Sequence, residues 1–204
     1  MRILLIDDHA LVRAGLERLI ASVFDAQIDQ AAGGREALAL LKRRRPDLVI
    51  LDLNLPGLGG LELLRRIVHL GVGPILVLSM HAEPLYAKRA LEAGAAGYVT
   101  KNASPDELLA ALRRILAGGR YVEAELAQAM ALEVAPAGSS LDALSVREIE
   151  IMRLLAAGSS LAEIAEAVGV GYKTVANSCS QIKSKLGVSR TADLVRLAIE
   201  TGVS

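Results

Sequence analysis

Five polar side chains that could together carry out phosphoryl chemistry stand at the ends of short apolar runs: Asp7, Asp8, Asp52, Ser79 and Lys101. A run of Val, Ile and Leu without polar alternation predicts a strand buried on both faces. In an open parallel sheet, ligands bind at the carboxyl ends of such strands. We therefore expect these side chains to meet on one edge of a sheet.

The chemistry of this set is that of an aspartyl-phosphate site. Carboxylates gathered on one edge repel each other and need a hard cation such as Mg²⁺, which prefers oxygen ligands. We expect Asp7, Asp8 and Asp52 to hold Mg²⁺ and Asp52 to be the nucleophile that accepts a phosphoryl group. Lys101 would offset charge on the phosphoryl oxygens, and Ser79 would donate a hydrogen bond to one of them.

The elements that must position these side chains form a repeated strand and helix unit. Amphipathic helical patterns follow five apolar runs, which predicts a doubly wound, five-stranded parallel sheet with right-handed crossovers. We expect strands at 2–6, 27–31, 48–53, 74–79 and 97–100, and helices that begin near Leu11 and at 34–45, 61–70, 84–93 and 105–116.

Residues 1 to about 118 resemble the receiver domain of bacterial response regulators. The segments IDDH, DLNLPGLGG, VLSMH and GYVTK occur in the order and spacing of that family. The resemblance implies a flavodoxin-like fold and a sensor histidine kinase as the phosphate donor. It also implies that the backbone carbonyl of Asn54 completes the Mg²⁺ shell and that Tyr98 rotates in response to Ser79. Many receivers have a proline after the lysine, whereas this chain has Asn102, so the geometry of the Lys101–Asn102 peptide bond is left open.

A change of pattern separates this region from the rest of the chain. Residues 119–140 read as a linker with one helix at about 123–134, followed by the small, turn-rich residues 135–140. The tail, residues 141–204, has four short helical patterns and no strand pattern. Ser145 and Glu148 form a capping-box pair at the start of the first helix. We expect the later helices at 161–168, 172–186 and 190–201.

The second and third helices of the tail are separated by a glycine-bearing turn at 169–171, which is a helix-turn-helix arrangement. On the third helix, Val175, Cys179, Ile182 and Leu186 recur at helical spacing and should be core. The segment between Val168 and Thr191 carries four cations, Lys173, Lys183, Lys185 and Arg190, and no acid. Such a patch attracts phosphates, but four cations support a solvated surface and a DNA-binding surface about equally.

The tail also resembles a known family, the LuxR-type DNA-binding domain, through the segments EIA, KTVAN and KLGVS. Joined to a receiver, it makes a NarL/FixJ-type regulator. The resemblance implies that Lys173 and Thr174 contact phosphates and that Ala176, Asn177 and Ser180 reach base edges. Gln181, Lys183 and Lys185 complete the expected DNA-binding set. Two residues depart from the family pattern, because Ser178 stands in place of a histidine and Gly171 in place of a serine cap.

Composition limits the other classes of function. The formal net charge is +0, so bulk charge indicates neither nucleic acid nor a membrane surface as a partner. The single cysteine, Cys179, excludes an intramolecular disulfide and is interpreted as a buried inert thiol. The amino terminus lacks the pattern of a signal peptide, and no apolar run has the roughly 18 residues of a membrane span, so we expect a cytoplasmic protein. The cations Arg43, Arg44 and Arg45 are interpreted as complements to a helix dipole.

The sequence therefore predicts a phosphorylation-dependent transcriptional regulator that binds promoter DNA as a homodimer. It would be no enzyme beyond phosphotransfer to its own Asp52 and slow autodephosphorylation. One alternative is a Mg²⁺-dependent aspartyl-phosphate phosphohydrolase, which usually has a second acid two residues after the nucleophile, where this chain has Asn54. A second alternative is a regulator that binds DNA without phosphorylation.

Overall fold

The computed structural model describes residues 1–56, 59–132 and 143–201, which fall into two compact units, Met1–Val134 and Ala135–Ser204. The predicted boundaries at 118/119 and 140/141 stay predictions, and the turn-rich segment 135–140 lies outside the described residues. A helix does follow the receiver-like region, as expected, and it is counted with the first unit.

The first unit is built on one parallel sheet with the strand order β2-β1-β3-β4-β5-β6. The five predicted strands are present, and the expectation of only five is wrong, because a short sixth strand pairs with the edge of β5. This strand has two residues, which is too short a run to be recognised as a strand from the sequence. The strands are β1 Arg2–Ile6, β2 Gln27–Ala31, β3 Leu48–Leu51, β4 Ile75–Ser79, β5 Gly97–Thr100 and β6 Tyr121–Val122.

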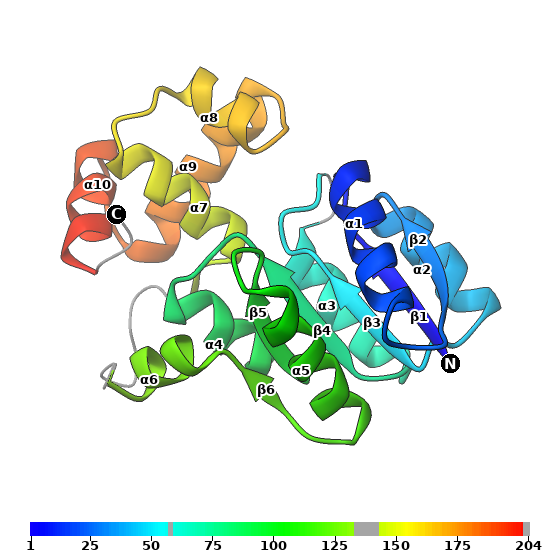
Figure 1. The fold of residues 1–204 in the computed structure, drawn as a ribbon. Helices are drawn as coiled ribbons and strands as arrows, with labels where there is room; N and C mark the ends of the chain where they lie inside the picture. Colours follow the sequence, from blue (N-terminus) through cyan, green and yellow to red (C-terminus); the bar gives the residue numbers. More distant parts are fainter. Residues whose placement is uncertain (57–58, 133–142, 202–204) are drawn as a thin grey trace. The chain divides into compact units, whose positions relative to one another are not determined.

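Helices cover both faces of this sheet, with α1 and α5 on one face and α2 and α3 on the other (Figure 1). The helix α4 packs against β5 and against α6. The doubly wound architecture predicted from the repeated units is therefore confirmed. The helices are α1 Ala10–Ala21, α2 Gly34–Arg43, α3 Gly60–His69, α4 Pro84–Glu92, α5 Pro105–Leu116 and α6 Ala124–Leu132.

The unbroken apolar runs fold as buried strands because both of their faces are covered. Every residue of β3 and β4 is buried, including the polar Ser79. Alternate residues of a strand face the same side of the sheet, so each strand contributes to two cores. The core under α5 contains Ile3, Leu5, Leu48, Ile50, Leu76, Leu78, Val99, Leu108, Leu109, Ala111, Leu112 and Ile115. This packing fixes where each strand ends, and thereby where Asp7, Asp52 and Lys101 stand.

A glycine at the start of α3 sets the path of the loop that follows Asp52. A methyl group added at Gly60 would overlap the backbone of Leu53, whereas one added at the neighbouring Gly59 would meet nothing within 4 Å. We expect Gly60→Ala to lower the free energy of unfolding by about 1–3 kcal/mol or more, because backbone cannot move aside as a flexible side chain can. Gly59→Ala is the matched control and should change it by less than about 0.5 kcal/mol. Urea unfolding midpoints measure both, and equal midpoints for the two variants would contradict this account.

The described residues of the second unit form four α-helices, α7 Val146–Ala156, α8 Leu161–Ala167, α9 Tyr172–Leu186 and α10 Thr191–Glu200. The predicted capping box of Ser145 and Glu148 begins α7, and a second one, Ser160 with Glu163, begins α8. Gly169 has a φ of +67° in the turn between α8 and α9, which only glycine adopts without strain. The predicted all-α helix-turn-helix unit is therefore present.

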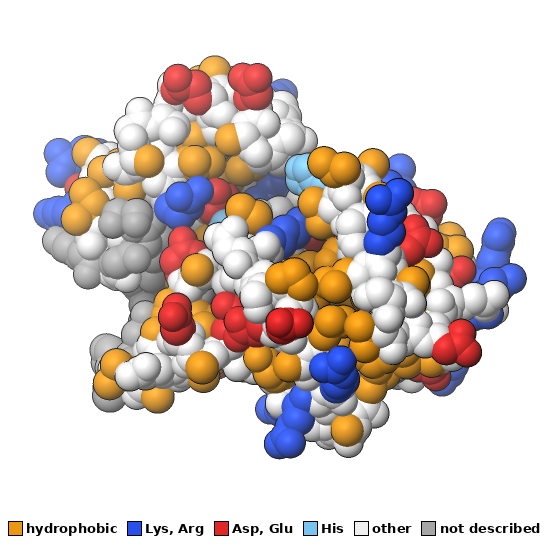
Figure 2. Space-filling view, viewed as in Figure 1, with side chains coloured by type: hydrophobic (Ala, Val, Ile, Leu, Met, Phe, Trp, Pro, Cys, Tyr) orange, Lys and Arg blue, Asp and Glu red, His pale blue; other side chains and the backbone are white. Residues whose placement is uncertain are grey.

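The surface agrees with a net charge of zero. On the face that Figure 2 shows, acidic and basic side chains both occur on each unit, so neither unit presents one sign of charge alone there. Among the described residues, no helix is both long enough and apolar enough to cross a membrane.

Candidate phosphoacceptor site and DNA-binding helix

The carboxyl edge of the sheet brings together three of the predicted site residues. Asp7 follows β1, Asp52 follows β3 and Lys101 follows β5, with the two carboxylates 2% and 1% exposed. The Lys101 ammonium lies between them, with Nζ 2.7 Å from Asp7 Oδ2 and 2.6 Å from Asp52 Oδ2. The convergence expected from the parallel topology is therefore observed for these side chains.

The electrostatics of this cluster keep a lysine charged beside a buried carboxyl group. Burial raises the pKa of Asp52 above its ordinary value, although the Asn54 amide, which donates to Oδ1 at 2.9 Å, and Lys101 oppose this shift. Burial alone would lower the pKa of Lys101, but its contacts with Asp52 and Asp7 outweigh that effect and raise it. Lys101 is thus a fixed positive charge beside Asp52.

The acidic residues also offer ligands for a cation. Oxygen atoms of Asp7, Asp8 and Asp52, together with a ring nitrogen of His9, lie within 4.8 Å of one another. Asp8 Oδ1 is shielded from solvent and accepts no hydrogen bond from the described residues, although His9 Nδ1 lies 2.8 Å from it. A buried carboxylate oxygen without a hydrogen bond is costly, and a hard cation would satisfy it. The donor set therefore fits Mg²⁺, with the backbone oxygen of Asn54 still a prediction as a further ligand.

The two predicted switch residues are both fully buried and meet at the backbone of His81. The amide of His81 donates to Ser79 Oγ at 3.3 Å, and its carbonyl accepts from the Tyr98 hydroxyl at 2.8 Å. Burial raises the pKa of Tyr98 above its usual range; an interaction with the Ser79 side chain opposes this shift, and the nearby acids Glu83, Asp52 and Glu123 add to it. Tyr98 is therefore a neutral donor in this arrangement, and the backbone of His81 connects it with Ser79.

Sequence reasoning missed the part that His81 plays at this edge and assigned no role to the residue. The ring is 7% exposed and stacks on Tyr86 of α4, with ring centroids 4.0 Å apart. Its Nε2 lies 2.9 Å from Asn54 Oδ1, so one side chain joins the loop after Asp52 to α4. Nothing in the local pattern of this loop signals such contacts, because they join separate segments. The peptide bonds of the described residues include no cis bond, so the Lys101–Asn102 bond is trans.

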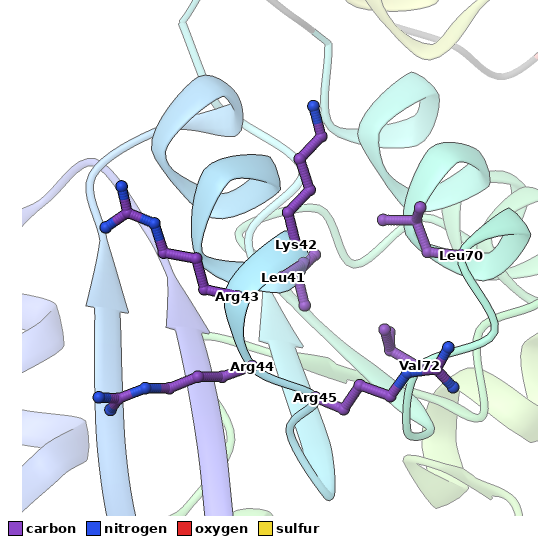
Figure 3. A pocket seen from close by; sticks show the side chains of 7 residues that line it. All are labelled: Leu41, Lys42, Arg43, Arg44, Arg45, Leu70 and Val72. Atoms are coloured by element: carbon purple, nitrogen blue, oxygen red, sulfur yellow. The ribbon is translucent and has the colours of Figure 1, made fainter.

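A second polar feature of the first unit lies at the opposite end of the sheet. A cavity of about 370 Å³ is lined by Leu41, Lys42, Arg43, Arg44, Arg45, Leu70 and Val72. Figure 3 shows that the charged groups of Arg43 and Arg44 point away from that of Arg45, so they do not converge on one centre. The lining has no acid, thiol or hydroxyl group that could act on a substrate. We therefore retain the interpretation that these cations complement the dipole at the carboxyl end of α2.

The helix α9 presents two distinct faces, as its pattern predicted. Val175, Cys179 and Ile182 are buried and Leu186 is half-buried, while the opposite face is polar. Burial raises the pKa of the Cys179 thiol, which agrees with an inert core cysteine. Of the expected DNA-binding residues, Ala176 and Lys183 are half-buried, and the exposed ones are Lys173, Thr174, Asn177, Ser180, Gln181 and Lys185.

One of these exposed cations already has a partner inside the unit. Lys185 Nζ donates to Glu148 Oε2 at 2.7 Å, which ties the end of α9 to the capping box of α7. Glu148 is buried, and the contacts of its carboxylate with Lys185 and Ser145 outweigh burial and lower its pKa. Lys185 is therefore a tether within the unit, and any contact with a phosphate competes with this ion pair.

This ion pair predicts how stability depends on pH. Because the pKa of Glu148 is lower in the folded state, its contribution should be full above its ordinary value of about 4.5 and lost as pH falls through the folded value. Glu148→Gln should therefore be destabilising near pH 7, on the order of 1 kcal/mol, with the difference from the parent shrinking below pH of about 4.5. Hydrogen exchange of the α7 and α9 amides measures it. A difference that stays constant down to pH of about 3 would contradict the assignment.

Comparison with known proteins identifies the family of each unit. The family model described as "Response regulator receiver domain" matches residues 3–113, and the model described as "Bacterial regulatory proteins, luxR family" matches residues 142–198. Both resemblances noted in the sequence are thereby confirmed.

Relatives match over most of the chain. "Transcriptional activator protein ExaE" of Pseudomonas putida is 40% identical, over 100% of this chain and 98% of that protein. A LuxR-family response regulator from Aurantimonas sp. SI85-9A1 is 44% identical with a TM-score of 0.61, over 64% of this chain and 94% of that one. RcsB of Salmonella enterica serovar Typhimurium, solved bound to promoter rprA in the presence of phosphomimetic BeF3−, is 25% identical with a TM-score of 0.62, over 97% and 98% of the two chains. The chain belongs to the two-component response regulators that join a receiver domain to a LuxR-type DNA-binding domain.

Proposed function

We propose that this protein is a cytoplasmic transcriptional regulator whose binding to promoter DNA is controlled by phosphorylation of Asp52. The observation that carries the proposal is the buried Asp52 carboxylate held 2.6 Å from the Lys101 ammonium, with Asp7 and the under-bonded Asp8 beside it. The partners are a sensor histidine kinase, double-stranded promoter DNA and a second copy of the chain.

The chemical step is a transfer of a phosphoryl group to the chain's own side chain. A carboxylate oxygen of Asp52 attacks phosphorus, the bond from phosphorus to the donor nitrogen of a phosphohistidine breaks, and that nitrogen takes up a proton. Lys101 offsets the added negative charge, and Ser79 Oγ donates to a phosphoryl oxygen. Mg²⁺ held by Asp7, Asp8, Asp52 and the Asn54 carbonyl supplies further charge stabilisation when bound. Slow autodephosphorylation at Asp52 completes the activity, without other substrates.

The response then spreads through the residues that contact one another at this edge. Before phosphorylation, the Ser79 hydroxyl accepts a hydrogen bond from the His81 amide, and the His81 carbonyl accepts one from the Tyr98 hydroxyl. A phosphoryl oxygen that recruits Ser79 changes the first of these contacts, which biases the positions of the loop and of Tyr98. The state so favoured would expose a dimer surface and leave the DNA-binding unit free to bind.

Beryllofluoride, which mimics a phosphoryl group on a carboxylate, should raise the dimer fraction in the presence of Mg²⁺. Sedimentation velocity measures this fraction, and ¹⁹F NMR shows whether the fluoride is bound. A sample without Mg²⁺ is the control, and its dimer fraction should not change when beryllofluoride is added. An unchanged sedimentation profile with bound fluoride would contradict the proposed control of assembly.

The phosphohydrolase alternative lacks support from the site. Position 54 carries an amide where such enzymes place a second acid, and the Asn54 side chain is already engaged with the His81 ring at 2.9 Å. The LuxR-type unit would also have no use in such an enzyme. A regulator that never receives phosphate would have no need of Lys101 held between two buried carboxylates, since buried charges are expensive.

A further inference from the structure

The last residue of β5, next to Lys101, is hydrogen-bonded by a side chain and not by the neighbouring strand β6. The pairing of β5 with β6 ends at Tyr98 and Val122, so the amide of Thr100 lies beyond the last paired residues. A buried amide without a partner is costly. The carboxylate of Glu123 fills this place, because its Oε1 accepts from the Thr100 amide and its Oε2 lies 3.3 Å from the Thr100 hydroxyl.

The same residue begins α6. The carbonyl of Glu123 accepts from the amide of Ala127 at 2.8 Å, which makes Glu123 the cap of that helix. The helix then packs against α4, with Leu126 buried. Glu123 is therefore bound at both ends, by its side chain to the end of β5 and by its backbone to the first turn of α6.

Thr100 connects this tether to the phosphoacceptor site. It directly precedes Lys101, whose amide donates to the Ser79 carbonyl at 2.7 Å and whose ammonium holds Asp7 and Asp52. The route from Asp52 to α6 thus consists of three residues, Lys101, Thr100 and Glu123. The Glu123 carboxylate also lies close enough to Tyr98 to be among the acids that raise its pKa.

We propose that Glu123 is a positioning residue that transmits the state of the phosphoacceptor site to α6, the last described helix of the first unit. The inference rests on the proposed function, because it requires that Lys101 change partners when Asp52 is modified. Once Lys101 turns toward a phosphoryl group, the end of β5 is held differently, and α6 follows because Glu123 binds it. A conformational change passes between two sites only where contacts differ between the two states, and this hydrogen-bonded pair supplies such a contact.

The probe is beryllofluoride with Mg²⁺, added to the full chain. Occupancy is measured by ¹⁹F NMR, and the response of α6 by hydrogen exchange of its amides. In the parent, bound beryllofluoride should change α6 exchange several-fold. In Glu123→Gln, which keeps an acceptor for the Thr100 amide, α6 should stay protected and should keep at least half of the parent's response. In Glu123→Ala the change in α6 exchange should vanish, while the affinity for beryllofluoride changes by less than about 3-fold.

Glu125→Ala is the matched control, since Glu125 is exposed in the first turn of the same helix. Its response should equal that of the parent. A response in Glu123→Ala equal to that of the parent, or a response in Glu123→Gln that falls as far as in Glu123→Ala, would show that the hydrogen bond to Thr100 does not carry the coupling and would overturn the inference. If bound beryllofluoride leaves the hydrogen exchange of the α6 amides unchanged in the parent, the inference is overturned, while the proposed phosphorylation of Asp52 is not. A parent that binds no fluoride would remove the proposed function and this inference together.

Discussion

Asp52→Asn should accept no phosphoryl group from acetyl phosphate, whereas the parent should become phosphorylated when Mg²⁺ is present. The amide is the same size as the carboxylate but is no nucleophile, so the expected loss of rate is at least roughly 1000-fold. The substituted amide would still contact Lys101, so the fold should persist. Intact-protein mass spectrometry measures the phosphoryl group, and its release by hydroxylamine shows that it was an acyl phosphate.

Two comparisons give this result its meaning. Asp106→Asn, an exposed aspartate in the first turn of α5, should be phosphorylated like the parent. Asp8→Asn should lower the rate and weaken the dependence on Mg²⁺, because it removes a ligand while leaving the nucleophile in place. A hydroxylamine-sensitive phosphate that survives on Asp52→Asn would show that another side chain is the acceptor.

The part of this site that was predictable from sequence is the part that topology dictates. Asp7, Asp52 and Lys101 each end a strand of a parallel sheet, and parallel strands bring their carboxyl ends to one edge. No knowledge of side-chain packing is needed for that step. The same reasoning predicted the buried face of α9, since helical spacing alone assigns Val175, Cys179 and Ile182 to one side.

The part that was not predictable consists of contacts between segments that local pattern cannot relate. His81 stacks on Tyr86 and reaches Asn54, but the ring could equally have faced solvent, as His9 largely does. The sequence around Glu123 predicts the start of a helix. Its carboxylate reaches Thr100 only because β6, which directly precedes Glu123, pairs with β5. The strand β6 itself has two residues, too few for any alternation to be read.

The second unit gives a further example of the same limit. Lys173 and Lys185 look alike in the sequence, as two cations on one helix without nearby acids. Lys185 is bound to Glu148, which lies 37 residues earlier in the chain, while Lys173 is exposed and has no ion-pair partner among the described residues. We therefore expect Lys173 and Lys185 to contribute unequally to DNA affinity.

Lys173→Ala and Asn177→Ala should weaken DNA binding in different ways, provided that α9 lies in the major groove. Lys173 stands in the first turn of the helix, where a phosphate contact would be independent of sequence, so its loss should weaken binding to all sequences alike and lower the salt slope by about one. The exposed Asn177 amide can pair bidentately with adenine, so its loss should cost about 1–3 kcal/mol at one base position and little elsewhere. Binding sites selected from random duplexes, followed by titration at several salt concentrations, measure both effects.

The arrangement of the selected sites provides the final test, because a small helical unit on its own makes few phosphate contacts. Two copies of the chain should bind two half-sites about one helical turn apart, as dimeric helix-turn-helix proteins do. Lys88→Ala, an exposed lysine on α4 of the first unit, serves as the control for loss of charge alone and should leave both affinity and salt slope unchanged. Lys185→Ala should cost less DNA affinity than Lys173→Ala, since Glu148 already holds Lys185 and a phosphate gains little by replacing it. A selection that yields only single half-sites, or an Asn177→Ala variant with the parent's preference at every base, would mean that this polar face of α9 does not read the groove.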